Sequence, residues 1–79
     1  MDNYQLKAKI SGAYIRSIRL ERNETREKFA EATDLASKHI GEIERGEKLP
    51  RTDTLLKFRK TGIDINRILD NINQELAKN

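Results

Sequence analysis

The sequence contains no cysteine, one histidine, one proline and no long apolar run. Without cysteine the chain cannot form a disulfide or a cysteine-ligated zinc or iron–sulfur site, and a single histidine cannot build a multi-histidine centre. We therefore expect no metal and no cofactor. No segment reaches the ~20 apolar residues that span a bilayer, and the polar N-terminus is unlike a signal peptide. We expect a cytoplasmic protein with no membrane partner.

The chain of 79 residues is long enough for one small domain, in which little room remains for an enclosed substrate cavity. No nucleophile, base and acid form a catalytic set, so we expect neither an enzyme nor a small-molecule substrate. Sixteen lysine and arginine residues against thirteen acidic residues give a net charge of +3. This mild excess is compatible with a nucleic-acid partner and also with a solvated helical surface. Only the positions of the charges along the chain can distinguish these two interpretations.

Apolar residues recur at helical spacing in several segments, and no segment alternates with period two for long enough to form a strand. Residues 1–10 are polar and are interpreted as an N-terminal arm, either frayed or an early helical turn. Ser11 is expected to cap a first helix over residues 12–22. Four further helices are expected at residues 26–33, 37–45, 52–61 and from 65 onward. The sequence therefore predicts an all-α domain of five helices over residues 11–70, with a C-terminal helical extension over residues 71–79.

The apolar positions of these segments predict the core. The residues expected to face inward are Tyr14, Ile15, Ile18, Leu20, Phe29, Ala30, Thr33, Leu35, Ile40, Ile43, Leu55, Leu56, Phe58, Ile65, Ile68 and Leu69. The last helix, capped by Asp64, has the clearest amphipathic pattern in the chain. Ile72 and Leu76 continue its apolar side, and they are expected either to pack on the first helix or to form the seam of a dimer.

Residues 25–46 contain two short helical patterns joined by three residues and ended by a glycine. Thr25 is expected to cap the first helix. Asp34 begins the link and adopts the left-handed conformation more easily than a bulky residue does. Ala36 precedes the second helix and cannot cap it, which costs ~1 kcal/mol, so Ser37 is expected to take over the cap. The pattern is typical of a helix-turn-helix.

Several short motifs follow one another along the chain. They are G-x-x-I-R-x-I-R at Gly12–Arg19, F-A-E at Phe29–Glu31, I-G-E-I-E-R-G at Ile40–Gly46, Pro50, T-L-L-K-F at Thr54–Phe58 and G-I-D-I at Gly62–Ile65. With these motifs, residues 12–69 resemble the Cro and lambda-repressor-like (XRE) family of helix-turn-helix proteins. The resemblance implies a compact five-helix fold, DNA binding in the major groove and a homodimer on a near-palindromic site. It also implies an ion pair between Arg19 and Glu44.

The sequence departs from the family at three positions of the motif. Arg26 stands where glutamine is usual, Asp34 where glycine is usual, and Ala36 where serine or threonine is usual. An arginine at position 26 can still bind a phosphate, so this departure is compatible with DNA binding.

The predicted base-reading face is the side of the second motif helix opposite Ile40 and Ile43. It consists of Ser37, Lys38, Gly41 and Glu42. Lys38 could donate to guanine O6 and N7, because side chains near the start of such a helix reach base edges in the major groove. Glu42 could accept from cytosine N4, repel phosphate, or pair with Lys38 on a solvated face.

Phosphate contacts are predicted around this face. The residues expected to make them are Thr25, Arg26, His39, Arg45, Lys48 and Arg51. The start of the helix at residue 26 would point its N–H groups at a phosphate, and cations after the second helix would lie on the other side of the groove. For His39 a second interpretation stays open, in which it is a partly buried residue at the flank.

Two functions are compatible with this sequence. The first is a sequence-specific regulator of phage or mobile-element type that binds double-stranded DNA, acts as a repressor and is encoded by a bacterium or a phage. The second is a protein-interaction module on the same fold, such as an antitoxin or anti-repressor. The acidic residues Glu24, Asp34 and Glu42 near the reading face motivate the second.

Overall fold

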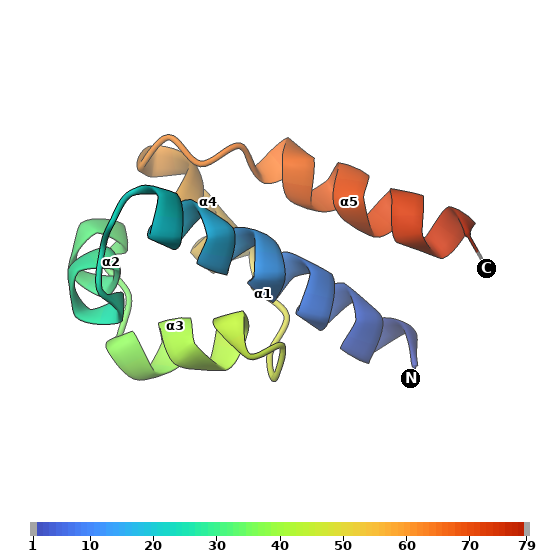
Figure 1. Cartoon of the computed structure of the whole chain (residues 1–79), viewed down its shortest axis with the longest axis horizontal. Helices are drawn as coiled ribbons and strands as arrows, with labels where there is room; N and C mark the ends of the chain where they lie inside the picture. The colour runs from blue at the N-terminus through green and yellow to red at the C-terminus, as the bar shows by residue number, and fades with distance from the viewer. Residues whose placement is uncertain (1, 79) are drawn as a thin grey trace.

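The computed structural model describes residues 2–78, and these form five α-helices joined by short links (Figure 1). The helices are α1 (Asn3–Glu21), α2 (Arg26–Thr33), α3 (Ser37–Glu44), α4 (Thr52–Lys60) and α5 (Ile65–Ala77). The predicted all-α, five-helix fold is therefore confirmed. The long helix α1 packs against both α3 and α5, while α2 contacts α3 and α4.

The first helix begins nine residues before the predicted start, so the expected cap by Ser11 is wrong. Asp2 caps α1 instead: its carboxylate accepts from the Gln5 backbone N–H at 2.7 Å, and the Gln5 side chain accepts from the Asp2 N–H at 3.3 Å. Such a reciprocal arrangement is a capping box. Ser11 lies fully buried within α1, and its hydroxyl donates to the carbonyl of Lys7 at 2.8 Å.

The segment from Asn3 to residue 10 is therefore part of α1. Met1 and Asn79, the outer ends of the predicted arm and extension, lie outside the described residues. Ala8 is fully buried in this segment, so it also contributes to the core. A helix can start there because the polar residues that suggested an arm supply the cap and the exposed face.

The other four helices lie close to their predicted positions. Helix α2 has the predicted bounds, and α3 and α4 each end one residue earlier than predicted. Asp64 caps α5 as expected, with its carboxylate accepting from the Asn66 N–H at 3.0 Å. Among residues 2–78, no helix combines the length and apolar character that crossing a membrane requires.

The core lies where α1, α2, α3 and α4 meet. Its fully buried apolar side chains are Ala8, Ile15, Phe29, Ile40, Ile43 and Phe58. The rings of Phe29 and Phe58 stack with their centroids 6.1 Å apart, which joins α2 to α4. Ile63, which the sequence pattern did not predict, is also buried in the link between α4 and α5.

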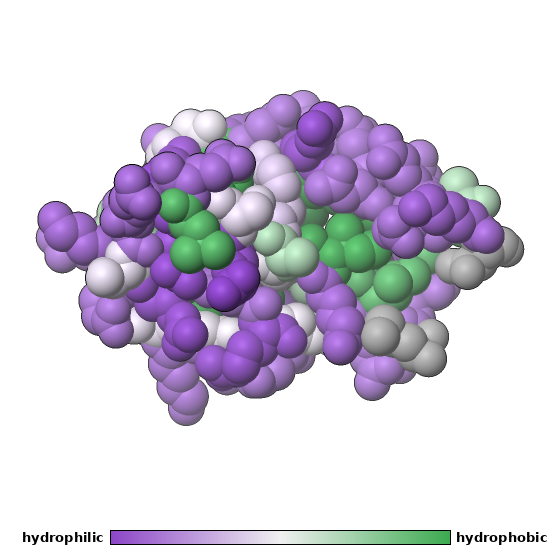
Figure 2. All heavy atoms as spheres, in the orientation of Figure 1, coloured by the Kyte–Doolittle hydropathy of each residue, from purple (hydrophilic) through white to green (hydrophobic). Residues whose placement is uncertain are grey.

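Three leucines expected in the core are exposed instead. Leu20, Leu56 and Leu69 retain 47%, 41% and 57% of their accessible surface. Helical geometry explains Leu56: Thr54 and Phe58, four residues apart, both face the core, so the residue midway between them points to the other side. Figure 2 shows a mostly hydrophilic surface with apolar atoms gathered where α5 lies beside the first half of α1.

Helices α1 and α3 cross at very short distance where Gly12 meets the end of α3. A Cβ atom added to Gly12 would lie 2.0 Å from the backbone carbonyl oxygen of Ile43. The backbone of α3 therefore occupies the space that any side chain at position 12 would need. This contact fixes the distance between α1 and the second helix of the motif.

We predict that Gly12→Ala destabilises the fold by about 3 kcal/mol, at the upper end of the usual cost of overpacking a core. Urea denaturation of the purified variant measures this loss. Gly41→Ala is the matched control, since its added Cβ would meet only the flexible end of Arg45. An alanine within a helix gains up to ~1 kcal/mol over glycine, so the control is expected to be at least as stable as the parent. Equal effects of the two substitutions would contradict this account of the crossing.

Candidate nucleic-acid interface

Helices α2 and α3 are joined by a turn of three residues. The Thr25 hydroxyl accepts from the Lys28 N–H at 3.1 Å, which confirms the predicted cap of α2. Asp34 ends α2 in the left-handed conformation (φ 58°, ψ 43°), as expected for an aspartate at this position. The Leu35 N–H then donates to the Ala30 carbonyl at 2.9 Å and directs the chain into α3. The two helices thereby have the short, sharp connection of a helix-turn-helix.

The start of α3 has no side-chain cap. Ala36 occupies the cap position with extended backbone, and its side chain offers no acceptor. Ser37 is the first residue inside the helix, so the prediction that it takes over the cap is wrong. The chain already enters the helix at Ala36, whose carbonyl accepts from the Ile40 N–H at 3.1 Å. Partners for the first N–H groups of α3 must therefore come from solvent or a ligand.

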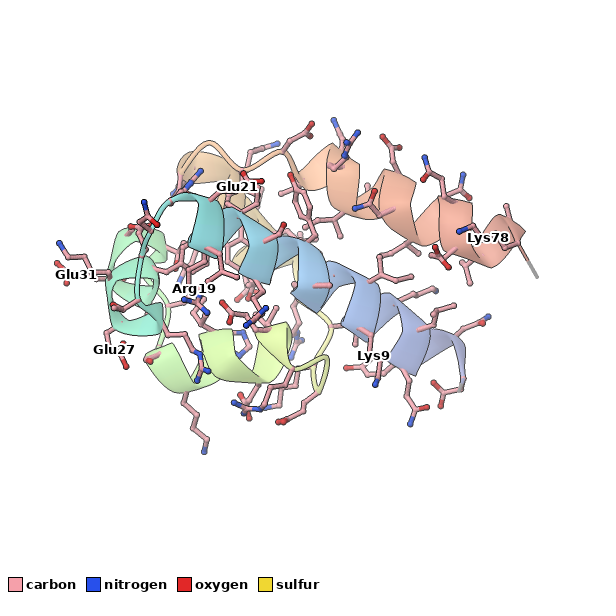
Figure 3. All side chains as sticks on the ribbon, viewed as in Figure 1. Lys9, Arg19, Glu21, Glu27, Glu31 and Lys78 are labelled. Atoms are coloured by element: carbon pink, nitrogen blue, oxygen red, sulfur yellow. The ribbon has the colours of Figure 1, made fainter. Side chains whose placement is uncertain are left out.

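A buried carboxylate fixes the far end of α3 to the first helix. The Arg19 guanidinium donates twice to Glu44, from Nε at 2.7 Å and from Nη2 at 3.0 Å. Its Nη1 donates to the Glu24 carbonyl at 2.9 Å, just before α2 begins. The Glu44 side chain is only 3% exposed, and its hydrogen bond raises the pKa of Arg19. Figure 3 shows Arg19 extending from α1 toward α3.

Arg26 is the second cation beside Glu44. Its Nε lies 3.7 Å from the Glu44 carboxylate, and its side chain remains 50% exposed. Arg26, which replaces the glutamine usual in the family, thus has Glu44 as an ionic partner within the motif. Arg26 therefore belongs to the same charge group as Arg19 and Glu44, and about half of its side chain faces solvent.

The helix α3 buries Ile40 and Ile43 completely, so its other side faces outward. Lys38 is exposed and Ser37 is half-buried on that outer side. Glu42 is only 18% exposed, because it contacts Lys48 at 3.5 Å and His39 at 3.7 Å. The acid therefore pairs with these two residues rather than with Lys38.

His39 lies at the flank of α3, with its side chain 29% exposed. Its Nε2 is 3.5 Å from the Thr54 hydroxyl on α4, on the side away from Glu42. His39 thus bridges the outer side of α3 and the next helix. This position agrees with the interpretation of a partly buried flank residue, and it leaves part of the ring accessible.

Gly41 is buried, although it lies on the side of α3 that was predicted to read bases. The Arg45 side chain covers it: a Cβ added to Gly41 would lie 2.9 Å from Arg45 Nη1. Arg45 in turn donates from Nε to the Glu47 carboxylate at 2.5 Å, and from Nη2 at 3.4 Å. This hydrogen bond raises the pKa of Arg45 and lowers that of Glu47, so both groups stay charged at neutral pH.

Sequence analysis did not identify Glu47 as part of this surface. The only sequence signal is its place two residues after Arg45, across the turn at Gly46 (φ 74°). Lys48 and Arg51 follow in the loop and are both exposed. The motif therefore brings Lys38, Arg45, Lys48 and Arg51 onto or next to α3, with two carboxylates between them.

An all-helical domain with two short helices joined by a tight turn, the second of them presenting polar side chains to solvent, is a helix-turn-helix domain. Residues 15–61, more than half of the chain, match the model of the helix-turn-helix family. The chain belongs to this family, and its five-helix fold is the Cro and lambda-repressor-like one that the sequence motifs indicated. Family and fold are those of a DNA-binding transcription regulator.

Two crystal structures of the clp gene regulator ClgR from Corynebacterium glutamicum are similar to this chain. One is 25% identical with a TM-score of 0.74, covering 90% of this chain and 77% of the other. The second is 24% identical with a TM-score of 0.73, covering 87% of this chain and 91% of the other. No protein of curated function matches the sequence.

We predict that Arg19→Ala lowers the free energy of unfolding by about 3 kcal/mol, because it leaves a buried carboxylate with only a distant partner. Chemical denaturation measures the effect. Arg16→Ala on the exposed side of the same helix is the control, and it is expected to change stability by no more than about 0.5 kcal/mol. A similar small loss for both variants would show that the Arg19–Glu44 pair does not stabilise the fold.

Proposed function

We propose that the protein is a sequence-specific regulator that binds double-stranded DNA and reads the major groove with α3. The observation that carries this proposal is the outer side of α3, where Lys38 is exposed opposite the buried Ile40 and Ile43. A helix fits the major groove, and side chains of its first turns reach the base edges. Lys38 donates to guanine in this arrangement, with Ser37 beside it.

Phosphate contacts on both sides of the groove would hold α3 in register. The start of α2, with Thr25 and Arg26, presents free N–H groups and a half-exposed cation to one strand. On the other side, Lys48 and Arg51 are exposed in the loop after α3. His39 adds a part-exposed ring at the flank. These contacts position the protein without reading sequence.

The finer assignment is a repressor of phage or mobile-element type. Its support is the resemblance of the motifs to those of Cro and lambda-repressor-like proteins. A small domain can repress simply by occupying its site, which requires no contact other than DNA binding. The ClgR structures are described as those of a gene regulator, which agrees with regulation of transcription.

A homodimer through α5 would place two copies of α3 on the two halves of a near-palindromic site. A groove of about 390 Å³ opens between α1, α5 and the α3–α4 link, and Leu49, Leu69, Ile72 and Leu76 line it among others. Leu69 is 57% exposed there, and its side chain continues the apolar lining of the groove into one patch of the kind that marks a protein contact. Covering this groove with the α5 of a second copy would bury Leu69 and Leu76.

The alternative is a protein-interaction module, and a specific observation favours it. Glu42 and Glu47 each lie against cations of the outer surface of α3, at 3.5 Å from Lys48 and 2.5 Å from Arg45. This surface is therefore less positive than its lysines and arginines suggest. A face of mixed charge suits a protein partner as well as it suits DNA.

Binding to duplex DNA at increasing salt separates the two functions. A DNA-binding regulator loses affinity steeply with salt because phosphate contacts release counterions. Its affinity for a selected site is also expected to exceed the non-specific range of about 10⁻⁴ to 10⁻⁶ M. If the affinity for every duplex of a random pool lies within that range, the proposal of a sequence-specific regulator is contradicted and the protein-interaction module is favoured.

Lys38→Ala is expected to change which sequences are selected, because Lys38 is proposed to read a base. Arg51→Ala is the matched control: it is expected to weaken all sequences about equally and to lower the salt slope by about one. Binding-site selection and titrations on the selected duplexes measure both effects. An unchanged preference for Lys38→Ala, with a uniform loss, would assign Lys38 to a phosphate.

Leu69→Asp and Leu76→Asp are expected to convert the dimer to monomer, since each places a carboxylate in the apolar groove. Leu20→Asp is the control, because Leu20 is similarly exposed but does not line the groove. Sedimentation of the free protein and of its DNA complex gives the mass. If all three variants have the same mass distribution as the parent, the proposal of a dimer through α5 is contradicted.

A further inference from the structure

Three residues form one line along the outer side of α3: Ser37, Gly41 and Arg45, each four residues from the next. Residues four apart in a helix lie one above the other, so this line runs from the first turn of α3 to its end. The predicted base-reading face contains the first two residues of the line. Arg45 is its third member, although sequence analysis assigned it to a phosphate.

The Arg45 side chain is folded back along this line rather than away from the helix. A Cβ atom at Gly41 would lie 2.9 Å from Arg45 Nη1, 3.6 Å from Cζ and 3.7 Å from Nη2. The whole guanidinium therefore rests over the glycine, one turn nearer to the start of α3 than its own Cα. Any larger residue at position 41 would occupy this place, so Gly41 provides the space.

Glu47 holds the guanidinium in this orientation. Its carboxylate accepts from Nε at 2.5 Å and from Nη2 at 3.4 Å, which occupies one edge of the planar group. Within residues 2–78 no side chain or carbonyl accepts from the other edge, formed by Nη1 and the second N–H of Nη2, so that edge is open to a ligand. Both side chains remain about half exposed, at 50% for Arg45 and 52% for Glu47, so a ligand can approach.

We propose that Arg45 is a specificity-determining residue that reads a guanine, with Gly41 and Glu47 as the residues that position it. This inference rests on the proposed function, in which α3 lies in the major groove. Arginine donating from two nitrogens to guanine O6 and N7 is the commonest specific contact of this kind. A guanidinium with one free edge, fixed on the outer line of the recognition helix, has the donors that such a contact needs.

Charge favours a base over a phosphate as the ligand of Arg45. The pair with Glu47 is neutral as a whole, and the carboxylate beside the guanidinium would repel a phosphate. A base edge carries no net charge, so it benefits from the oriented donors without that repulsion. Lys48 and Arg51, which follow in the loop, are the cations better suited to the backbone.

Binding-site selection from a random duplex pool with the full chain tests the inference. Discrimination is then measured by titrating the selected duplex against one in which the relevant guanine–cytosine pair is replaced. Arg45→Ala is expected to lose one guanine preference and reduce discrimination there by about five- to 150-fold, the usual value of one such contact. Arg45→Lys is expected to restore it only in part, because lysine lacks the planar fork.

Variants of the two positioning residues keep Arg45 itself. Glu47→Gln and Gly41→Ala are expected to reduce the same guanine preference. The thermal midpoint of Gly41→Ala is expected to stay at or above that of the parent, and that of Glu47→Gln close to it, because a half-exposed ion pair contributes little to stability. Arg51→Ala is the matched control, and it is expected to retain the preference with weaker binding to all duplexes. A loss caused only by misfolding would lower the thermal midpoint, so the two measurements together identify the positioning role.

Two other results would decide against parts of this scheme. If the parent protein selects a site and Arg45→Ala keeps every preference while weakening all duplexes equally, Arg45 contacts phosphate and the inference is overturned. If the parent selects no sequence at all, the proposed function itself is wrong, and the inference is overturned with it.

Discussion

The buried carboxylate of Glu44 is stable only because an arginine neutralises its charge. The position of the helix-turn-helix against α1 depends on this ion pair. The Glu44 side chain is only 3% exposed, and a buried charge of this kind is tolerated only when it is paired and hydrogen-bonded. Arg19 supplies two hydrogen bonds from α1, and its third nitrogen reaches the Glu24 carbonyl before α2. One guanidinium thus joins the first helix, the entry to α2 and the end of α3. The close crossing at Gly12 then sets the distance between α1 and α3.

The helices of this fold are largely predictable from the sequence, because the spacing of apolar residues and the capping residues are local properties of the chain. Thr25 and Asp64 cap α2 and α5 as their positions predict, and the bounds of α2 agree fully. Hydropathy does not predict the start of α1, because residues 3–10 are mostly polar, although the sequence contains the capping box of Asp2 and Gln5. Leu20, Leu56 and Leu69 show a second limit: an apolar residue near an apolar face can still point to solvent.

The outer side of α3 was less predictable, because its geometry depends on contacts that spacing alone does not give. Helical spacing predicts Gly41 among the base-reading residues, but Arg45 covers its surface. The same spacing allows Glu42 to pair with Lys38, yet Glu42 lies beside Lys48 and His39. The loop after α3 contributes to both differences, because the turn at Gly46 places Glu47 against Arg45 and Lys48 against Glu42. Because the chain reverses at such a turn, charged residues of the loop come to lie beside helix residues that helical spacing does not pair with them.

The missing cap at Ala36 affects how the motif moves. A first turn whose N–H groups have no side-chain acceptor opens at lower free energy than the centre of the same helix, where Ile43 is fully buried. Docking a ligand on this turn must first order it, and the entropy lost in doing so reduces the affinity. The end of α3 is thus held by the Arg19–Glu44 pair and the buried Ile43, whereas its first turn has no side-chain cap.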